Sequence, residues 1–336
     1  MDKSTNFKYF IGIDVSKKTL DLSVLKGKDF EFHVQIDNSI DGLNDFLKLL
    51  KKQKINISNC LWCAENTGVY NEHLKKICET NEMFLWIEKP LQIIRSQGVT
   101  RGKNDKIDSK RIALFAYKNQ DTAVKWLSPR NIVIRIKRLI SLRRNLMNNL
   151  KQVKLAVNEK TFLGSDIELL CKSCELSVNA LKQDVKNIEK EILKLIQEDA
   201  KLNHMYKLIT SIDGIGMFTA VEVIISTNEF KNFDNAKKFA CYCGVVPFDY
   251  SSGTSVFKKA RVSPMANINL KTLLHMSALS SVAMQGEMRE YFTRKVSEGK
   301  NKMSVLNAIR NKLILRIFAV IKKDQSYQKD FSFSFA

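Results

Sequence analysis

Apolar and polar positions in the amino-terminal part of the chain alternate between the periods of strands and helices. Runs rich in β-branched, aromatic and other apolar residues predict strands at 9–15, 19–25, 30–36, 60–64 and 83–87. Apolar positions at helical spacing predict helices over about 41–52 and 69–80. Three strands in succession, followed by helices alternating with strands, predict a mixed α/β domain, which we place at 1–128.

A longer helical pattern follows this domain. Leucine and valine recur every three or four residues from 139 to 157, and the same spacing, with isoleucine added, returns from 181 to 195. The interruption at 161–166 separates the two patterns. We therefore expect an antiparallel helical hairpin at 129–204, a coiled-coil stalk. It packs either on itself or on a second subunit, because heptads this short do not fix the oligomeric state.

The residues at 205–325 predict a second globular domain, mostly helical, with a short β portion around 240–257 and a frayed tail beyond about 325. Within it, the run 212–220 has the form of a turn between two helices. Gly214 and Gly216 would leave backbone N–H groups free to meet a phosphate at a helix N-terminus. The alternative is a tight turn between helices that requires glycine for its backbone alone.

The net charge of the chain indicates which class of molecule it binds. The chain has 336 residues, enough for two compact domains, and its 55 lysines and arginines against 35 acids give a formal charge of +20. Such a chain favours a polyanion, either nucleic acid or an anionic membrane surface. No apolar run approaches the length that spans a bilayer, and the first residues lack the order of a signal peptide. We expect a cytoplasmic nucleic-acid-binding protein with no membrane partner.

Seven cysteines give no even disulfide framework, and we expect most of them to be buried in a reducing compartment. Two Cys-x-x-Cys pairs, Cys60/Cys63 and Cys171/Cys174, would suit a zinc ion if the fold brought them together. The first pair lies in a predicted strand, where residues three apart point to opposite faces. No histidine stands at ligand spacing beside either pair, so a zinc site is disfavoured.

Four acids stand at informative positions. Asp14 lies within an apolar strand, where a carboxylate is costly unless a cation meets it. Glu65 ends a strand and precedes the turn-forming residues 66–68. Asp105 and Asp108 lie three apart at the start of a helical pattern, on one face. If the four converge, they form an oxygen-only site for Mg²⁺ or Mn²⁺, ions that stabilise the attacking and leaving oxygens of a phosphodiester displacement.

Each acid also has an ordinary explanation. Asp105 and Asp108 suit a helix start because they complement its dipole, and Glu65 suits a surface turn. We favour the metal site because the acids occur together. The basic residues around the third and fourth acids fit the approach of a phosphate, although a run of charges is usually a solvated face. These residues are Arg101, Lys103, Lys106, Lys110 and Arg111.

A short polar loop follows the run Cys243-Gly244-Val245-Val246-Pro247. In it, Ser252 precedes Gly253 and can present its hydroxyl as a nucleophile. By itself, a serine before a glycine usually marks a turn.

Taken in order, these blocks resemble a known family over almost the whole chain. Residues 12–17, 65–70 and 103–108 match the three acidic blocks of the DEDD transposases of the insertion-sequence "one-ten" type. The glycine turn, the Gly-x-x-Pro run at 244–247 and Ser252-Gly253 match the carboxy-terminal domain of that family. The order of the three acidic blocks agrees with the strand order predicted above, which is that of the ribonuclease-H-like fold.

The resemblance implies a RuvC-like, ribonuclease-H-like DEDD domain at 1–128, a coiled-coil connection, and a mostly α transposase domain at 205–325 with a helix-hairpin-helix-like element. Asp14, Glu65, Asp105 and Asp108 would be the metal ligands. Ser252 would attack DNA and form a phosphoserine link. Nucleic-acid contacts are expected from the basic residues named above and from Gly214, Gly216, Lys258, Lys259 and Arg261.

Similar proteins are RNA-guided recombinases, in which a structured noncoding "bridge" RNA pairs with donor and target DNA. The resemblance therefore implies both DNAs, a guide RNA and a homo-oligomer, a dimer or tetramer, as partners. This chain departs from the family after the serine, where 259–267 carries alanine and proline in place of the usual glycine and base. Lys271 would stand in for the family's arginine, and the adjacent Ser251 stays open as the nucleophile.

Two alternatives stay open. One is a metal-dependent nuclease of the junction-resolvase kind, in which water attacks and the second domain only binds DNA. The other is an inactive nucleic-acid-binding copy of such an element. Four intact acids count against decay, whereas the altered segment after Ser252 counts for it.

Overall fold

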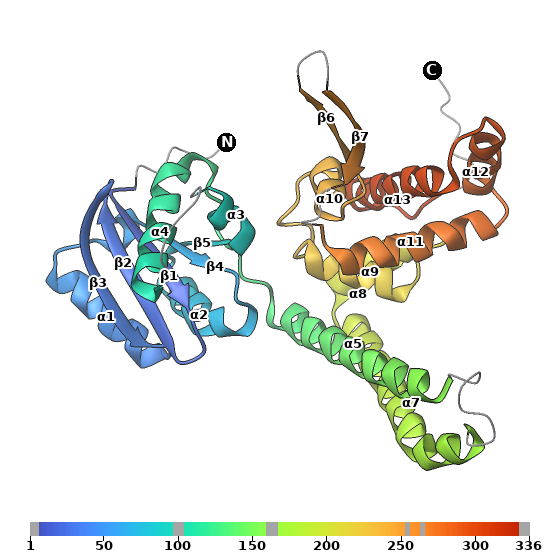
Figure 1. Cartoon of the computed structure of the whole chain (residues 1–336), viewed down its shortest axis with the longest axis horizontal. Coiled ribbons are helices and arrows are strands. Elements are labelled where there is room, and N and C mark those ends of the chain that lie inside the picture. The colour runs from blue at the N-terminus through green and yellow to red at the C-terminus, as the bar shows by residue number, and fades with distance from the viewer. Residues whose placement is uncertain (1–6, 97–103, 159–166, 253–255, 263–265, 329–336) are drawn as a thin grey trace. The chain divides into compact units, whose positions relative to one another are not determined.

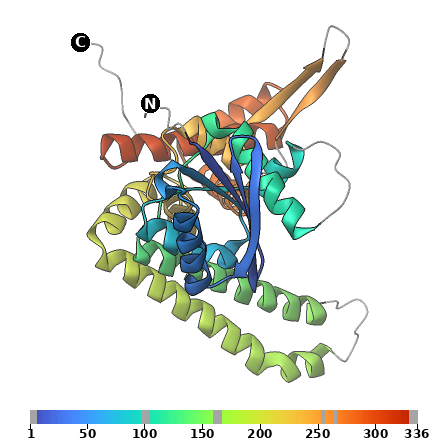
Figure 2. The same ribbon diagram turned by 90° about the vertical axis from the view of Figure 1, so that its left-hand side faces the viewer.

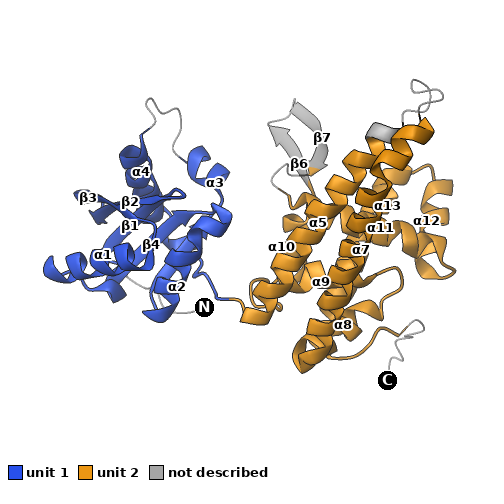
Figure 3. Ribbon diagram, turned by 90° about the horizontal axis from the view of Figure 1, so that it is seen from below, with its two compact units in different colours: residues 1–128 blue, residues 129–336 orange. Residues whose placement is uncertain are grey.

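The computed structural model describes residues 7–96, 104–158, 167–252, 256–262 and 266–328. The chain divides into two compact units, Met1–Ser128 and Pro129–Ala336 (Figure 3). The predicted helical hairpin belongs to the second unit, so its description as a separate domain stays a prediction.

Unit 1 is built on one mixed sheet (Figure 1). Its strands are β1 Tyr9–Val15, β2 Thr19–Lys26, β3 Asp29–Asp37, β4 Cys60–Glu65 and β5 Phe84–Glu88. They lie in the order β3-β2-β1-β4-β5. β1 pairs antiparallel with β2 and parallel with β4, and β5 continues the parallel side. This is the ribonuclease-H-like strand order that the sequence predicts.

Helices cover both faces of this sheet. They are α1 Ile40–Lys52, α2 Glu72–Thr80, α3 Pro90–Arg95 and α4 Asp105–Lys118. Apolar residues of α1 and α2 pack on one face, and those of α3 and α4 pack on the other. Each predicted strand is present, and the last begins at Phe84 in place of Met83. The helix predicted from Val69 begins as a 3₁₀ turn, Gly68–Asn71, before α2.

Unit 2 is mostly helical. Its elements are α5 Asn131–Asn158, α7 Ile167–Glu198, α8 Ala200–Thr210, α9 Met217–Ser226, α10 Ala236–Tyr242, β6 Pro247–Ser252, β7 Val256–Val262, α11 Ile268–Ala283, α12 Glu287–Ser297 and α13 Lys302–Lys323. The long helices α5 and α7 run side by side (Figure 2). The β portion begins later than predicted, at Pro247, because Asn235 caps α10 and residues 240–242 are helical, and it ends later, at Val262.

The two ends of the α5–α7 hairpin differ in burial. At its base, Val133, Ile136 and Ile192 are buried in the same core as the helices of the second half of the chain. Farther along both helices, Leu142, Leu155 and Leu176 are exposed. The base is therefore part of the core of unit 2.

Four of the seven cysteines are buried: Cys60, Cys63, Cys78 and Cys243. Cys60 and Cys63 are fully buried and belong to the cores on opposite faces of the sheet. Cys171 and Cys174 lie on α7, where Cys171 is exposed. All seven are free thiols. Within the described ranges, no helix is both long enough and apolar enough to span a bilayer.

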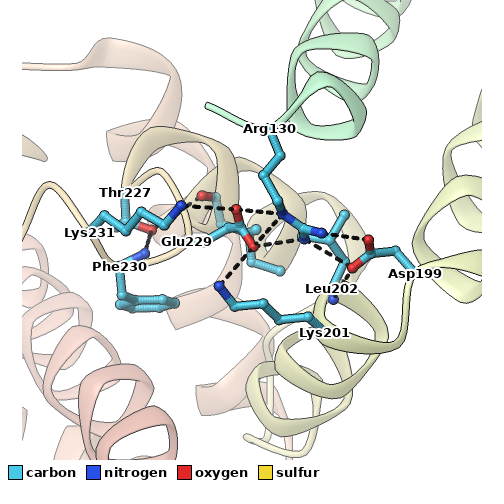
Figure 4. Close-up of polar contacts among 9 residues, drawn as sticks. Arg130, Asp199, Lys201, Leu202, Thr227, Glu229, Phe230 and Lys231 are labelled. Atoms are coloured by element: carbon cyan, nitrogen blue, oxygen red, sulfur yellow. Dashed lines mark hydrogen bonds and ion pairs between the residues drawn. The ribbon is translucent and has the colours of Figure 1, made fainter. Parts of the chain in front are cut away.

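An ion network fixes the start of α5 to the rest of unit 2 (Figure 4). Arg130 donates two hydrogen bonds to Asp199, at 2.7 and 2.9 Å. It also donates hydrogen bonds to both carboxylate oxygens of Glu229, at 2.8–3.1 Å. The Glu229 side chain is fully buried, and Lys201 reaches it at 3.2 Å. Asp199 is also the N-cap of α8, where it accepts from the N–H of Leu202. One guanidinium thus joins three segments.

Glu229 stands in an unusual turn. Asn228, Glu229 and Phe230 all have positive φ, between 49° and 63°, a region that side chains other than glycine occupy at a cost. Thr227 supports the turn by accepting a hydrogen bond from the N–H of Phe230. We infer that the Arg130 network offsets the strain of this turn.

Replacing Arg130 by methionine should destabilise unit 2 by about 2–3 kcal/mol, because Glu229 would stay buried without its bidentate partner. The matched control is Arg138→Met on the exposed side of α5, which should cost less than about 0.5 kcal/mol. Urea unfolding of the two variants measures the difference. Equal stabilities would show that the network contributes nothing.

Candidate active site

The predicted acids of the strands lie on neighbouring strands. Asp14 is the sixth residue of β1 and is half-buried. The parallel register sets Ile13 beside Ala64, so Glu65 at the end of β4 follows at the level of Asp14. On the other side of β1, Asp21 stands directly opposite Asp14. Residues directly opposite in an antiparallel pair share a face, so Asp14 and Asp21 point to the same side of the sheet.

Helix α4 brings the other two acids to this side. Its backbone lies directly on Gly12: a Cβ there would stand 2.1 Å from the amide nitrogen of Ala113 and 2.2 Å from the carbonyl oxygen of Ser109. The Ser109 hydroxyl is 2.9 Å from that of Ser23 on β2, and both serines are fully buried. Asn104 caps the helix by accepting from the N–H of Lys106. Asp105 and Asp108 thus fall in the first turn of a helix anchored beside Asp14.

Gly12→Ala tests this close approach. The added methyl group would meet backbone atoms of α4 that no side-chain rotation can move away. We expect a loss of about 1–3 kcal/mol in stability and a displaced α4, with loss of activity. Gly216→Ala is the comparison for stability, since its Cβ would have nothing within 4 Å. Thermal unfolding measures the stability of both variants. A Gly12→Ala protein as stable as the Gly216→Ala protein would contradict the described packing.

Burial and the neighbouring carboxylates both act on Asp14. The pKa of Asp14 is raised from 3.8 to about 6, first by burial and then by the negative charges of Glu65, Asp105, Asp108 and Asp21. Nearby negative charges disfavour ionisation of a carboxyl group, as burial does. The four predicted acids therefore act on a common region, with Asp21 as an additional member.

Oxygen donors of this kind fit a hard divalent cation such as Mg²⁺ or Mn²⁺, which would relieve their mutual repulsion. Their spacing does not by itself form a coordination shell: within the described ranges, no group of three or more His, Cys, Asp or Glu side chains is placed to hold a metal ion. Arg111 also binds Asp108, with 2.8 Å between Nη1 and Oδ1. The donor chemistry of these acids nevertheless agrees with the divalent metal that the sequence predicts.

Sequence patterns did not single out Asp21. It is 5% exposed, and its two oxygens accept from Gln35 at 3.0 Å and meet Nε2 of His33 at 2.9 Å. One feature of the sequence could have indicated it: Asp21 and Ser23 alternate with three apolar residues in β2. Such alternation is usual in a strand with one face toward solvent, whereas in this sheet α4 covers that face.

Asn71, also missed, holds the turn that presents Glu65. It is fully buried, donates to the carbonyl of Glu65 at 2.8 Å, and accepts from the N–H of Thr67 at 2.8 Å. Asn66 donates its N–H to the carbonyl of Glu88, which joins the turn to β5. A side chain that closes its own turn is hard to distinguish, in sequence, from an ordinary polar loop residue.

The predicted basic residues near α4 have different surroundings. Lys106 is exposed in the first turn of α4, and Arg111 pairs with Asp108. Lys110 extends over the ring of Phe30, 4.7 Å from its centre. Arg101 and Lys103 lie outside the described residues.

The two glycines of the turn between α8 and α9 also differ. Gly214 has φ +86°, and a Cβ there would clash with Ser281 of α11, so its backbone is packed against a helix. Gly216 is exposed, begins α9 as its N-cap residue, and has open space beside it. Gly214 therefore fits the tight-turn alternative, and its predicted phosphate contact stays a prediction, while Gly216 leaves the helix N-terminus accessible.

Ser252 is the last residue of β6, and its Cα pairs with that of Val256 on β7. Tyr250 pairs with Lys258 and Phe248 with Arg261 in the same hairpin, which also contains Lys259. Residues 253–255 and the side chains of 248–261 lie outside the described part of the structure. Roles for Ser252, Ser251 and the three basic residues therefore stay predictions.

Comparison with known proteins identifies the family. A DEDD family model of the IS110 type, described as a transposase, matches residues 11–159. A second model, described as "Transposase IS116/IS110/IS902 family", matches residues 206–293. The first match spans the acids and the first half of the hairpin, and the second spans the glycine turn and Ser252.

Several relatives match over long stretches. The "Pilin gene-inverting protein" of Moraxella bovis is 25% identical over 331 residues, which is 96% of this chain and 98% of the relative. The protein of that name from Moraxella lacunata is 24% identical over the same length. The "Transposase for insertion sequence element IS1111A" of Coxiella burnetii is 24% identical over 273 residues, 73% of this chain and 75% of the relative. This chain belongs to the IS110/IS116/IS902 family of transposases, enzymes that act on DNA, with a DEDD domain at its amino terminus and the family's second domain at its carboxyl terminus.

Proposed function

We propose that this transposase cuts and rejoins DNA through a covalent serine–DNA intermediate formed by Ser252 and assisted by the acidic cluster. The observation that carries the proposal is the grouping of Asp14, Glu65, Asp105 and Asp108, on the neighbouring strands β1 and β4 and the first turn of α4, which lies on Gly12. The position of Ser252 at the end of a strand, within the second matched region, supports its role as nucleophile.

The proposed reaction conserves the phosphodiester bond. The Oγ of Ser252 attacks a backbone phosphorus, a new P–O bond to serine forms, and one strand is released with a free hydroxyl that takes up a proton. A free hydroxyl of a second strand then attacks the phosphoserine, and the serine leaves and regains its proton. One P–O bond forms for each that breaks, so no external energy source is needed.

Asp14, Glu65, Asp105 and Asp108 would hold the divalent ion, which when bound supplies positive charge to the phosphate under attack. Gly12 sets the distance of α4 from β1, and Asn71 holds the turn of Glu65. Asp21, tied to His33 and Gln35, would orient Asp14 by keeping negative charge on its other side.

The proposed partners are donor DNA, target DNA and a structured noncoding guide RNA. The charge of +20 supports nucleic-acid binding. The exposed Lys106 and the open N-terminus of α9 at Gly216 are proposed phosphate contacts. The remaining contacts that we propose are Arg101, Lys103, Lys110, Arg111, Gly214, Lys258, Lys259 and Arg261.

A homo-oligomer, a dimer or tetramer, is proposed to form through the α5–α7 hairpin, a coiled coil in this proposal. The support is a set of apolar side chains exposed away from the base of the hairpin. They are Leu142, Met147, Leu155, Leu169, Leu170 and Leu176.

A second candidate function is inversion of a DNA segment. It is favoured by two relatives, each matched over 98% of its length, that are named as pilin gene-inverting proteins. Inversion and transposition share the proposed chemistry and differ in which ends are joined. A plasmid with two recognition sites in opposite orientation separates them, since inversion flips the intervening segment and transposition removes or copies it.

The two rivals predict different products. A metal-dependent nuclease would cut without a covalent protein–DNA product, and an inactive copy would only bind. The test incubates purified protein with Mg²⁺, RNA transcribed from its flanking sequence, and end-labelled donor and target DNA. A denaturation-resistant protein–DNA product supports the proposal, cleavage without it supports the nuclease, and binding alone supports the inactive copy.

A further inference from the structure

Arg310 is a buried cation in the middle of α13. Only 5% of its surface is exposed, and burial lowers its pKa. The structure gives its guanidinium no carboxylate partner among the described residues, and its Nε is buried without a hydrogen bond. A buried charge without an opposite charge is costly, so such a group needs an explanation.

Several other arginines of unit 2 are paired with carboxylates, which offsets the cost of removing their charge from water. Arg130 binds two carboxylates, and Arg144 lies 3.5 Å from the buried Glu222. Arg316, six residues after Arg310 on the same helix, pairs with Glu287. Arg310 differs from these because its described partners are all neutral.

Arg310 has two described partners, and one of them connects it to a third segment. Nη2 of Arg310 is 3.0 Å from Nδ1 of His275 on α11, and Nη1 is 3.4 Å from the side-chain oxygen of Asn307. Asn307 in turn donates to the carbonyl of Val245 at 2.6 Å. Val245 lies two residues before β6, the strand that ends with Ser252. Arg310 is therefore fixed to the base of the segment that carries the proposed nucleophile.

The contact with His275 determines where a proton is held. A guanidinium can only donate hydrogen bonds, so Nδ1 of His275 must accept. Burial and the charge of Arg310 both lower the pKa of His275, which favours the neutral ring. A neutral ring with Nδ1 unprotonated carries its hydrogen on Nε2, and His275 is only partly buried. The pair thus offers an N–H donor with a positive charge directly behind it.

A second cation lies nearby. Lys271 stands one turn before His275 on α11, and its Cδ is 3.8 Å from the place where a Cβ on Gly244 would be. Lys271 and Arg310 thus flank the residues that lead into β6. Both charges favour an anion at this place.

We propose that His275 and Arg310 form a binding site for a backbone phosphate of the DNA strand that Ser252 attacks. His275 donates to the phosphate through Nε2–H, and Arg310 is a positioning residue that fixes the imidazole and supplies the charge. The choice of this DNA strand rests on the proposed function. The site itself is an additional phosphate contact made by residues of unit 2.

The first experiment needs no catalysis. Thermal unfolding is followed in phosphate and in chloride of the same ionic strength, for the wild type, Arg310→Met and Arg316→Met. The wild type and Arg316→Met should gain about 3 °C from phosphate at a concentration well above its dissociation constant, and Arg310→Met should gain none. Without phosphate, Arg310→Met should melt no lower than the wild type, because the desolvated charge is gone.

The second experiment measures DNA binding against salt. Arg310→Met and His275→Gln should weaken binding about 5–10-fold and reduce the salt slope by about one, while Arg310→Lys should restore part of the affinity. A phosphate response in Arg310→Met equal to that of the wild type would overturn the site. Weakened RNA binding with unchanged DNA binding would overturn the assignment to DNA. If the wild type forms no serine–DNA product while Arg310 still governs the phosphate response, the proposed function fails and the anion site stands.

Discussion

Replacing Ser252 by alanine is expected to abolish the covalent protein–DNA product and to slow strand rejoining by at least about 1,000-fold. DNA binding should stay within about twofold of the wild type, because a single hydroxyl contributes little to a contact dominated by phosphate charge. The physical reason for the large effect is that alanine has no oxygen with which to form the ester. Denaturing gels of end-labelled DNA measure the product, and a mobility-shift assay measures the binding.

Ser251→Ala is the matched control for this variant. The two serines are adjacent in β6, so loss of either hydroxyl removes the same chemical group from the same strand. We expect Ser251→Ala to keep the covalent product. If Ser251→Ala loses the product and Ser252→Ala keeps it, the nucleophile is assigned to the wrong residue.

Asp14→Asn is expected to abolish activity and at the same time to stabilise the metal-free protein. The folded-state pKa of Asp14 is about 6, above its usual value of 3.8. Stability associated with this group is therefore full below about pH 3.8 and is lost as the pH rises through 6. At pH 7.5 the neutral asparagine should add about 1–2 kcal/mol, after allowance for the partial exposure of Asp14 to solvent. The gain should shrink as the pH is lowered and vanish near pH 4.

Binding of Mg²⁺ should make the wild type more stable than Asp14→Asn, the reverse of their order without metal. Addition of Mg²⁺ should raise the melting temperature of the wild type and leave that of Asp14→Asn unchanged, because the variant lacks the carboxylate. Asp45→Asn is the control, since Asp45 is an exposed acid on α1 that forms an ion pair with Lys48. It should behave as the wild type at every pH. A metal-free Asp14→Asn protein that is less stable than the wild type at pH 7.5 would show that the acids do not repel one another as described.

The sequence allowed most of unit 1 to be predicted. Apolar and alternating patterns placed every strand of the sheet, because each strand contributes apolar residues to a core, although those of β3 are only partly buried. The helix start at Asp105 was also predicted and is confirmed. Which carboxylates would share a region followed from the order of the elements and from the resemblance.

Sequence patterns did not predict the contacts between residues that lie far apart in the chain. Asp21 was overlooked because the strand register that sets it opposite Asp14 is a property of the folded sheet. Arg130 and Glu229 are 99 residues apart, and Arg310 and His275 are 35 apart. No local spacing connects such residues, and only packing of the helices brings them together.

The beginning of α2 and the β portion of unit 2 illustrate the limits of periodicity. Val69 is apolar and was counted in the helix, yet it lies in a 3₁₀ turn and is 74% exposed. Residues 240–242 are apolar or aromatic and were counted as β, yet they end α10, a short helix whose boundary is set by Asn235 and by Gly244 at φ +64°. Caps and left-handed glycines determine these boundaries, and hydrophobic spacing does not report them.

The central claim is a phosphoester between this chain and DNA at Ser252. The most direct test is to digest the denatured protein–DNA product with protease and nuclease and to locate the modified peptide by mass spectrometry. The account predicts a nucleotide phosphate attached to Ser252, absent when Mg²⁺ is omitted. Cut DNA ends with no modified peptide, or a nucleotide on a residue other than Ser252, would contradict it.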